Sequence, residues 1–169
     1  MSSLSDEHVK AALAAVESPD VSIPEKIDLL VEIAMGFQRK PHFIQDLRHA
    51  VSLYDRALAL CPADETVLTA RIMARKGTAL NAIPHEGPEF VEQARQLFES
   101  ALRGLQREGS LEEIAETEMN LGLALQALAT MGRARVADAI GAYLRALRTF
   151  TRESHATEFA ILHNNLATA

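Results

Sequence analysis

An apolar stripe that returns at a steady interval is the clearest pattern in this sequence. In its first copy, Ala50, Tyr54, Ala57 and Leu58 share one face of a helix, because steps of three and four residues stay on a face. The same order of alanine, aromatic residue, alanine and leucine returns within residues 94–102 and 139–147, after steps of 44 and 45 residues. The pattern predicts three equivalent helices.

A second series lies upstream of each stripe and has nearly the same period. Gly36, Gly77 and Gly122 are followed by Ala167 in a last, incomplete copy, with steps of 41, 45 and 45 residues. Two series with nearly one period predict a repeated unit of two helices. Glycine costs about 1 kcal/mol relative to alanine inside a helix. We therefore expect it to allow close approach of the two helices, while the aromatic ring fills the gap between one unit and the next.

These residues resemble the tetratricopeptide repeat. That family has an apolar residue, a glycine and a large residue on its first helix, then alanine, an aromatic residue and alanine on its second, often followed by proline. The matching positions are Met35-Gly36, Leu121-Gly122 with Leu125, Leu166-Ala167, and Ala50, Tyr54, Ala57 and Pro62. The resemblance covers about residues 24–169 and implies an all-α fold, a right-handed α-solenoid of stacked antiparallel helix hairpins.

The chain also departs from the family pattern. The bulky aromatic residue early in the first helix is replaced by Glu32, Met73, Glu118 and His163, and Lys76 stands where leucine is expected. The period is about ten residues longer than the usual 34. This long period and the segment 162–167 resemble the extended arrays of bacterial multidomain proteins, in which such repeats precede protease-like or signalling domains.

Caps and breaks set the expected boundaries. We expect a helix over 5–16 and a linker, together residues 1–20, and then a repeat domain over 21–169. Its units are expected at about 24–62, 64–108 and 110–152, followed by a partial unit at 154–169. The fold class is therefore about three hairpins and a terminal helix, without strands.

Two segments have the spacing of a capping box, Ser22 with Glu25 and Ser110 with Glu113, which places helix starts there. Asp64 is expected to cap the first helix of the second unit. The segment 83–88, with two prolines and a glycine, predicts a loop. The second helix of the third unit is expected to end near Thr151.

Composition and charge narrow the function classes. Hydrophobic residues make up 48% of the chain but aromatic residues only 5%, which favours helix over sheet. A net charge of −6 offers no general attraction to phosphate backbones, so nucleic acid is not an expected partner. The N-terminus has no secretory pattern, and no segment approaches the roughly 20 apolar residues of a membrane span. We expect a cytoplasmic protein without membrane partners.

The residues that usually carry catalysis are scattered. None of the six histidines has the spacing of a helical zinc site. The single cysteine, Cys61, precedes a proline at a helix C-terminus, where the helix dipole disfavours a thiolate. We expect the acidic residues 112–118 to form a solvated face. These observations predict no catalytic, cofactor or metal site and no enzyme, although a small-molecule hydrolase on a helical bundle is the third alternative.

In tetratricopeptide arrays the first helices line a concave groove that binds ligands. Carried over by the position of each glycine, the resemblance gives Leu30, Ile33 and Phe37 in the first unit, which form an apolar end. The groove residues beyond it form a basic middle and an amide-rich end. They are Arg71, Arg75, Thr78, Asn81, Glu116, Asn120, Leu123, Gln126, Asn164 and Asn165. Amide and guanidinium groups suit the backbone of an extended peptide.

Arg71 and Arg75 resemble the last pair of the family's clamp for a terminal carboxylate. Ile33 and Phe37 stand where its first lysine and asparagine would be. The two arginines are expected either to hold one carboxylate together or to pair with acids such as Glu112 or Glu116. We favour the pairing.

A second basic feature is the series Arg145, Arg148 and Arg152, which would form a stripe on the last second helix. We expect a solvated convex face, with a docking patch for an acidic partner as the sharper interpretation.

The predicted C-terminal helix is apolar on one face, at Phe159, Ile161, Leu162 and Leu166. We expect this face to continue a longer array, to be covered by a second copy of the chain, or to lie as a cap on the preceding helix. The leading hypothesis for function is a scaffold or adaptor module that binds a protein or peptide through its groove. The alternative is a sensor array that packs against a fused or partner effector domain.

Overall fold

The computed structural model describes residues 4–84 and 87–169. This part of the chain forms eight α-helices and no strand, which confirms the expected all-helical fold. The helices are α1 (Leu4–Glu17), α2 (Ile23–Arg39), α3 (Ile44–Leu60), α4 (Thr66–Ala82), α5 (Glu89–Glu108), α6 (Leu111–Thr130), α7 (Val136–Ala146) and α8 (Ala156–Thr168). Of the loop expected at 83–88, His85 and Glu86 lie outside the described residues.

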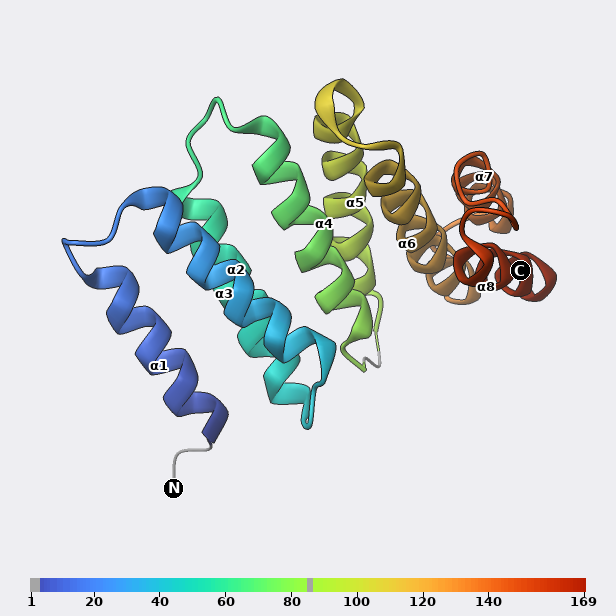
Figure 1. Ribbon diagram of the computed structural model, residues 1–169. Helices are drawn as coiled ribbons and strands as arrows, with labels where there is room; N and C mark the ends of the chain where they lie inside the picture. The colour runs from blue at the N-terminus through green and yellow to red at the C-terminus, as the bar shows by residue number, and fades with distance from the viewer. Residues whose placement is uncertain (1–3, 85–86) are drawn as a thin grey trace.

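The helices follow one another in a row, with the two termini at opposite ends (Figure 1). Each helix packs mainly against its neighbours in the chain, and the pairs α2/α3, α4/α5 and α6/α7 make the closest contacts. The first helices of these pairs, α2, α4 and α6, also touch one another in that order. None of the described helices combines the length and apolar character needed to cross a membrane.

Helix α1 packs against α2 through one apolar face. Val9, Leu13 and Val16 lie at the four- and three-residue steps of a helical stripe, and they contact the same core cluster as the residues of α2 and α3. The N-terminal helix therefore covers the first hairpin.

The helix starts follow the local chemistry of the sequence. Both predicted capping boxes form: the backbone N–H of Ser22 donates to Glu25 at 2.9 Å, and that of Ser110 donates to Glu113 at 2.9 Å. Asp64 does not cap α4, contrary to expectation, because the chain turns through Asp64 and the helix begins at Thr66. The start of α3 is stabilised by an aspartate in its first turn that was not singled out from the sequence, since Asp46 accepts the backbone N–H groups of His42 and Phe43.

The three repeated aromatic residues, Tyr54, Phe98 and Tyr143, are fully buried. Their closest polar and steric contacts lie within their own hairpin. Tyr54 donates a hydrogen bond to Gln38 and Tyr143 donates one to Gln126, each at 2.7 Å. The rings therefore pack between the two helices of one unit, whereas they were expected to fill the gap to the next unit.

Glycine serves close approach in two of the three units. A Cβ atom at Gly77 would lie 2.8 Å from the Phe98 ring, and one at Gly122 would lie 2.4 Å from the Tyr143 ring. The same expectation is wrong for Gly36, which is exposed and has no atom within 4 Å of an added Cβ. Gly36 lies 18 residues before its aromatic partner, whereas Gly77 and Gly122 each lie 21 before theirs, so it lies almost one helical turn further along its helix than they do.

Helix α7 ends earlier than expected, at Ala146 rather than near Thr151. The chain then forms turns, which place Phe150 in the core, where it is buried and contacts the ring of His155. Burial of this large ring stabilises the turn more than another helical turn at a Thr-Phe-Thr segment would. As a result, Arg148 and Arg152 lie beyond the helix.

The expected stripe of Arg145, Arg148 and Arg152 is therefore wrong, because these residues do not share one helix. Arg145 also has a local partner: its Nε and Nη2 atoms donate to the two carboxylate oxygens of Glu118 on α6, at 2.7 and 2.9 Å. The Glu118 side chain is only 12% exposed, so this pair joins α6 to α7 rather than presenting a free cation.

Candidate functional site

A cavity of about 370 Å³ lies on the side of the row where α2, α4 and α6 meet. Most of its walls come from the first helices of three successive hairpins, and one apolar residue comes from α5. The lining residues are Met35, Gln38, Arg39, Arg71, Ala74, Arg75, Thr78, Leu105, Glu113, Glu116, Thr117 and Asn120. The cavity therefore combines three arginines with two glutamates and several uncharged polar groups.

Five of the ten groove residues expected beyond the first unit line this cavity. They are Arg71, Arg75, Thr78, Glu116 and Asn120. The structure places the other five outside it: Asn81 near the end of α4, Leu123 and Gln126 on α6, and Asn164 and Asn165 on α8.

Two of these five have other roles. Leu123 packs against the larger core cluster. Gln126 accepts the hydrogen bond from Tyr143 and places its amide nitrogen 3.4 Å from the Thr168 hydroxyl. Both therefore help to hold α6 against α7 or α8.

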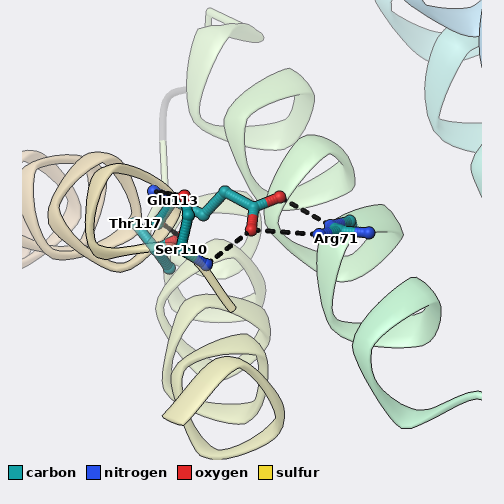
Figure 2. Close-up of polar contacts among 4 residues, drawn as sticks. All are labelled: Arg71, Ser110, Glu113 and Thr117. Atoms are coloured by element: carbon teal, nitrogen blue, oxygen red, sulfur yellow. Dashed lines mark hydrogen bonds and ion pairs between the residues drawn. The ribbon is translucent and has the colours of Figure 1, made fainter. Parts of the chain in front are cut away.

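Arg71 is paired across the cavity with Glu113, as Figure 2 shows. Its Nε and Nη2 atoms donate to the two carboxylate oxygens at 2.5 and 3.2 Å. These hydrogen bonds lower the pKa of Glu113 and raise that of Arg71. The same carboxylate accepts the backbone N–H of Ser110, so one side chain caps α6 and ties it to α4. The favoured pairing thus exists, but its acid is Glu113 rather than Glu112 or Glu116.

Arg75 lies one turn further along α4 and faces the other neighbour. Its Nη1 atom lies 2.8 Å from the sulfur of Met35 on α2. Among the described residues, neither Arg75 nor Arg39 forms an ion pair. Arg71 is thus paired on the α6 side, whereas Arg75 contacts α2. The positive charge of Arg75 still acts on Glu113 and helps to lower the pKa of that carboxyl group.

One lining residue of α2, Gln38, is held by a buried tyrosine that does not itself line the cavity. The hydroxyl of Tyr54 donates to the Oε1 atom of Gln38 at 2.7 Å. Burial raises the pKa of Tyr54 to about 12, although the positive charges of Arg75 and Arg39 act in the opposite direction. Tyr54 is therefore a neutral donor at physiological pH, and it holds the Gln38 amide in a fixed orientation.

Contacts between successive first helices repeat at one sequence offset. Arg71 contacts Glu113, Asn120 lies 3.5 Å from Thr78, and Gln126 lies 3.4 Å from Thr168, each pair being 42 residues apart. This common offset shows that α4, α6 and α8 are placed side by side in equivalent ways.

Several lining residues were not predicted from the sequence. Counting from Gly36 placed Leu30, Ile33 and Phe37 in the groove, but none of them lines the cavity, and Leu30 is fully buried. The α2 residues that do line the cavity are Met35, Gln38 and Arg39. They lie nearer the C-terminal end of their helix than the lining residues of α4 and α6 do, because neighbouring first helices touch at offsets of 40 and 42 residues, which are shorter than the repeat period.

The described residues hold no group of three histidine, cysteine, aspartate or glutamate side chains placed to bind a metal ion. Burial raises the pKa of the Cys61 thiol, which lies at the end of α3 beside a second, mainly apolar cavity. A raised pKa disfavours the reactive thiolate. No protein-family model matches the sequence, and neither curated proteins nor solved structures give a match.

Proposed function

We propose that this protein is a tetratricopeptide-like α-solenoid that binds an extended segment of another protein in the groove between α2, α4 and α6. The observation that carries the proposal is the 370 Å³ cavity lined by the first helices of three successive hairpins. The proposal assigns no catalytic step to the chain, and it makes the partner a protein or peptide rather than nucleic acid.

The lining suits a peptide for two reasons. An extended backbone offers an N–H or C=O group at each residue, and Asn120, Thr78 and Gln38 supply side-chain donors and acceptors along the cavity. Met35 and Leu105 supply apolar surface for side chains of the peptide. The cavity volume of about 370 Å³ lies within the usual range of ligand sites.

A variant that fills the cavity tests the proposal. Ala74 lines the groove from α4, and Ala74→Trp should occupy it with an indole ring while keeping the helix. Ala59→Trp on α3 is the matched control, since Ala59 is exposed and does not line the cavity. Both proteins would be probed with the same array of fluorescently detected octapeptides, after circular dichroism has shown equal helicity.

We expect the wild-type protein and the Ala59→Trp variant to bind the same set of peptides, and the Ala74→Trp variant to lose that set. A well-folded Ala74→Trp variant that keeps its peptides would show that binding occurs elsewhere. Absence of binding to any peptide by the wild-type protein would remove the support for a peptide-binding groove.

A second candidate function is assembly through the C-terminal edge, and the exposure of α8 favours it. On α4 and α6, Gly77 and Gly122 are covered by Phe98 and Tyr143 of the following helix. The corresponding residue of α8, Ala167, is exposed. The face that receives a partner helix in two hairpins is thus uncovered in α8.

In this second proposal a helix from another copy of the chain covers that face. Ala160 lies on the same stripe of α8, and Leu144 of α7 is 52% exposed beside the C-terminal edge of the row. Light scattering should then give the mass of two chains, and Ala160→Glu should return it to one. A monomer at all concentrations would reject this assembly without affecting the peptide groove.

A further inference from the structure

The α2–α3 loop carries the most exposed large apolar side chain of the described residues. Phe43 is 72% exposed, and Ile44, which follows it, is 48% exposed. Phe43 belongs to no core cluster and lines neither of the two cavities described above. Aromatic side chains of this kind are common anchors in interfaces between proteins. Phe43 and Ile44 thus form an apolar tip at the start of α3.

The charges beside this apolar tip are positive. Lys40 lies in the same loop, and Arg48 lies one turn after Ile44 on α3, so it shares the exposed face of that residue. Among the described residues, neither basic side chain forms an ion pair. The acid of this segment, Asp46, is only 4% exposed, and its carboxylate accepts two backbone N–H groups of the loop. The apolar tip is therefore flanked by basic side chains.

The second, mainly apolar cavity has a volume of about 330 Å³ and lies at the other end of α3. Leu58, Pro62 and Ala63 line it from the end of α3 and the turn that follows. Met73 and Gly104 line it from α4 and α5, and no charged side chain is among its lining residues. Apolar cavities of roughly 150 Å³ bind benzene. This cavity therefore has space for the ring of a phenylalanine.

The α6/α7 hairpin shows how the repeat closes the corresponding surface. Met73 and Ser100 line the cavity, and their equivalents 45 residues on are Glu118 and Arg145. Those two side chains form an ion pair, with hydrogen bonds of 2.7 and 2.9 Å, that joins α6 to α7. A methionine and a serine cannot form an ion pair, and the surface between α4 and α5 is open there.

The charges beside this cavity are negative. Asp64 and Glu65 directly follow the lining residue Ala63, and both are exposed. Neither acid forms an ion pair within the part of the chain that the structure describes. Burial raises the pKa of the Cys61 thiol, which lines the cavity, and the negative charge of Glu65 acts in the same direction. The charge of Glu65 is therefore felt inside the cavity.

The two ends of α3 are complementary in shape and in charge. One end presents an aromatic ring with basic side chains beside it, and the other presents an uncharged cavity with two acids beside it. The 17 residues of α3, about 25 Å, separate the two ends, so the ring cannot enter the cavity of its own chain (Figure 1). We propose that Phe43 of one copy of the chain occupies the cavity lined by α3, α4 and α5 of another copy.

This contact joins two different surfaces, so each pair of copies leaves one apolar tip and one cavity free for further copies. It differs from the assembly through the C-terminal edge, in which the face of α8 is covered. Phe43, Lys40 and the residues of the second cavity do not line the groove between α2, α4 and α6. The contact therefore goes beyond peptide binding, and it can fail while the groove still binds its peptides.

Sedimentation equilibrium measures the association at concentrations up to about 1 mM, where a contact with a Kd of that order is populated. Every protein would carry Ala160→Glu, which prevents association through α8. We expect the average mass of this parent to rise above one chain. Phe43→Ser should weaken the association at least about thirtyfold, the effect of removing an aromatic anchor from a pocket. Serine is a favoured N-cap residue, so α3 should keep its start.

A parent that stays at the mass of one chain would exclude a second copy as the occupant of the cavity. Association of the parent that Phe43→Ser leaves unchanged would also overturn the contact.

Mixing two variants tests the pairing itself. Phe43→Ser removes the ring but keeps the cavity, whereas Ala63→Trp fills the cavity but keeps the ring. Each variant alone should remain a single chain, and an equimolar mixture should form a complex of one chain of each. Ala59→Trp is the matched control, since Ala59 is exposed and lines neither cavity, and it should associate like the parent. A mixture that remains at the mass of single chains would show that the ring does not enter the cavity.

Met73→Glu/Ser100→Arg closes the cavity in a second way, because it copies the ion pair between α6 and α7. It should behave as Ala63→Trp does, both alone and in the mixture. Self-association equal to that of the parent in both closed variants, with helicity unchanged by circular dichroism, would contradict the contact.

Charge reversal separates this contact from unspecific association of exposed apolar side chains. Lys40→Glu/Arg48→Glu should weaken self-association, and so should Asp64→Lys/Glu65→Lys. A mixture of these two variants should associate again, since the altered charges beside the ring and beside the cavity are then opposite in sign. A mixture that associates no more strongly than either variant alone would overturn the proposed pairing.

Discussion

Replacing two glycines by alanine should have effects of opposite sign, although both lie within helices. Alanine is favoured over glycine in a helix interior by about 1 kcal/mol, so Gly36→Ala should stabilise the protein by about that amount. The new methyl group at Gly36 meets no atom within 4 Å. At Gly122 the same methyl group would lie 2.4 Å from the Tyr143 ring.

The ring of Tyr143 cannot move away without cost. It is fully buried, and its hydroxyl is held by Gln126 at 2.7 Å. Overpacking of a core by one methyl group costs about 1–3 kcal/mol. Because the helix-propensity gain is common to both variants, the free energies of unfolding of Gly36→Ala and Gly122→Ala should differ by this overpacking cost, about 1–3 kcal/mol.

Urea unfolding followed by circular dichroism measures this difference, provided that the two variants keep the same m-value. In thermal unfolding it should appear as a difference in Tm of about 2–4 °C for each kcal/mol in a chain of this size. The double variant Gly122→Ala/Tyr143→Leu should recover part of the loss, since the smaller side chain leaves room for the methyl group. Equal stability of the two single variants would refute the close approach of α6 and α7.

Three further predictions follow from buried or paired side chains. Phe98→Ala should lower the free energy of unfolding by about 3–5 kcal/mol, measured in urea, because the ring is fully buried against Gly77. Tyr54 and Tyr143, the only two tyrosines, should ionise near pH 12 in the native protein and near pH 10 in urea, which absorbance at 295 nm would show. Because their pKa values are raised in the folded state, the stability that they contribute is complete below pH 10 and is lost between pH 10 and 12. The pKa of Glu113 is lowered in the folded state, so the stability that Glu113 contributes is present above its unfolded pKa and is lost as the pH falls through its folded pKa. Glu113→Gln should therefore reduce the loss of unfolding free energy at acidic pH.

The fold was largely predictable because local chemistry decides most of its boundaries. The helices expected from Ser22 and Ser110 form where the capping boxes place them, and the first apolar stripe, Ala50 to Leu58, lies within α3. The end of α7 was not predictable from local chemistry, since it depends on burial of Phe150 in a core assembled from distant residues. The Thr-Phe-Thr segment has only weak helix propensity, so tertiary packing decides where α7 ends.

The candidate site was predictable only in part, because it depends on the register between neighbouring first helices. Arg71, Arg75 and Asn120 were placed in the groove by the position of the glycines, and they line the cavity. Arg39 was missed because the same groove positions were expected on every first helix, whereas the cavity crosses these helices obliquely. Neighbouring first helices touch at an offset of 42 residues rather than at the repeat period of 45, so the lining residues shift along the helix from one unit to the next.

The difference between the repeat period and the contact offset of neighbouring first helices also explains the charge of the groove. The repeat period makes Glu116 the equivalent of Arg71, 45 residues on, but neighbouring first helices touch at an offset of 42 residues, which brings Arg71 to Glu113 instead. At Arg75 this contact offset leads to Thr117, which is uncharged and lines the same cavity. Glu113 of the following hairpin therefore pairs with Arg71, whereas Thr117, which is uncharged, cannot form an ion pair with Arg75. The pairing of the two arginines of α4 is thus set by residues of the following hairpin, and it can be inferred from the sequence once the contact offset is known.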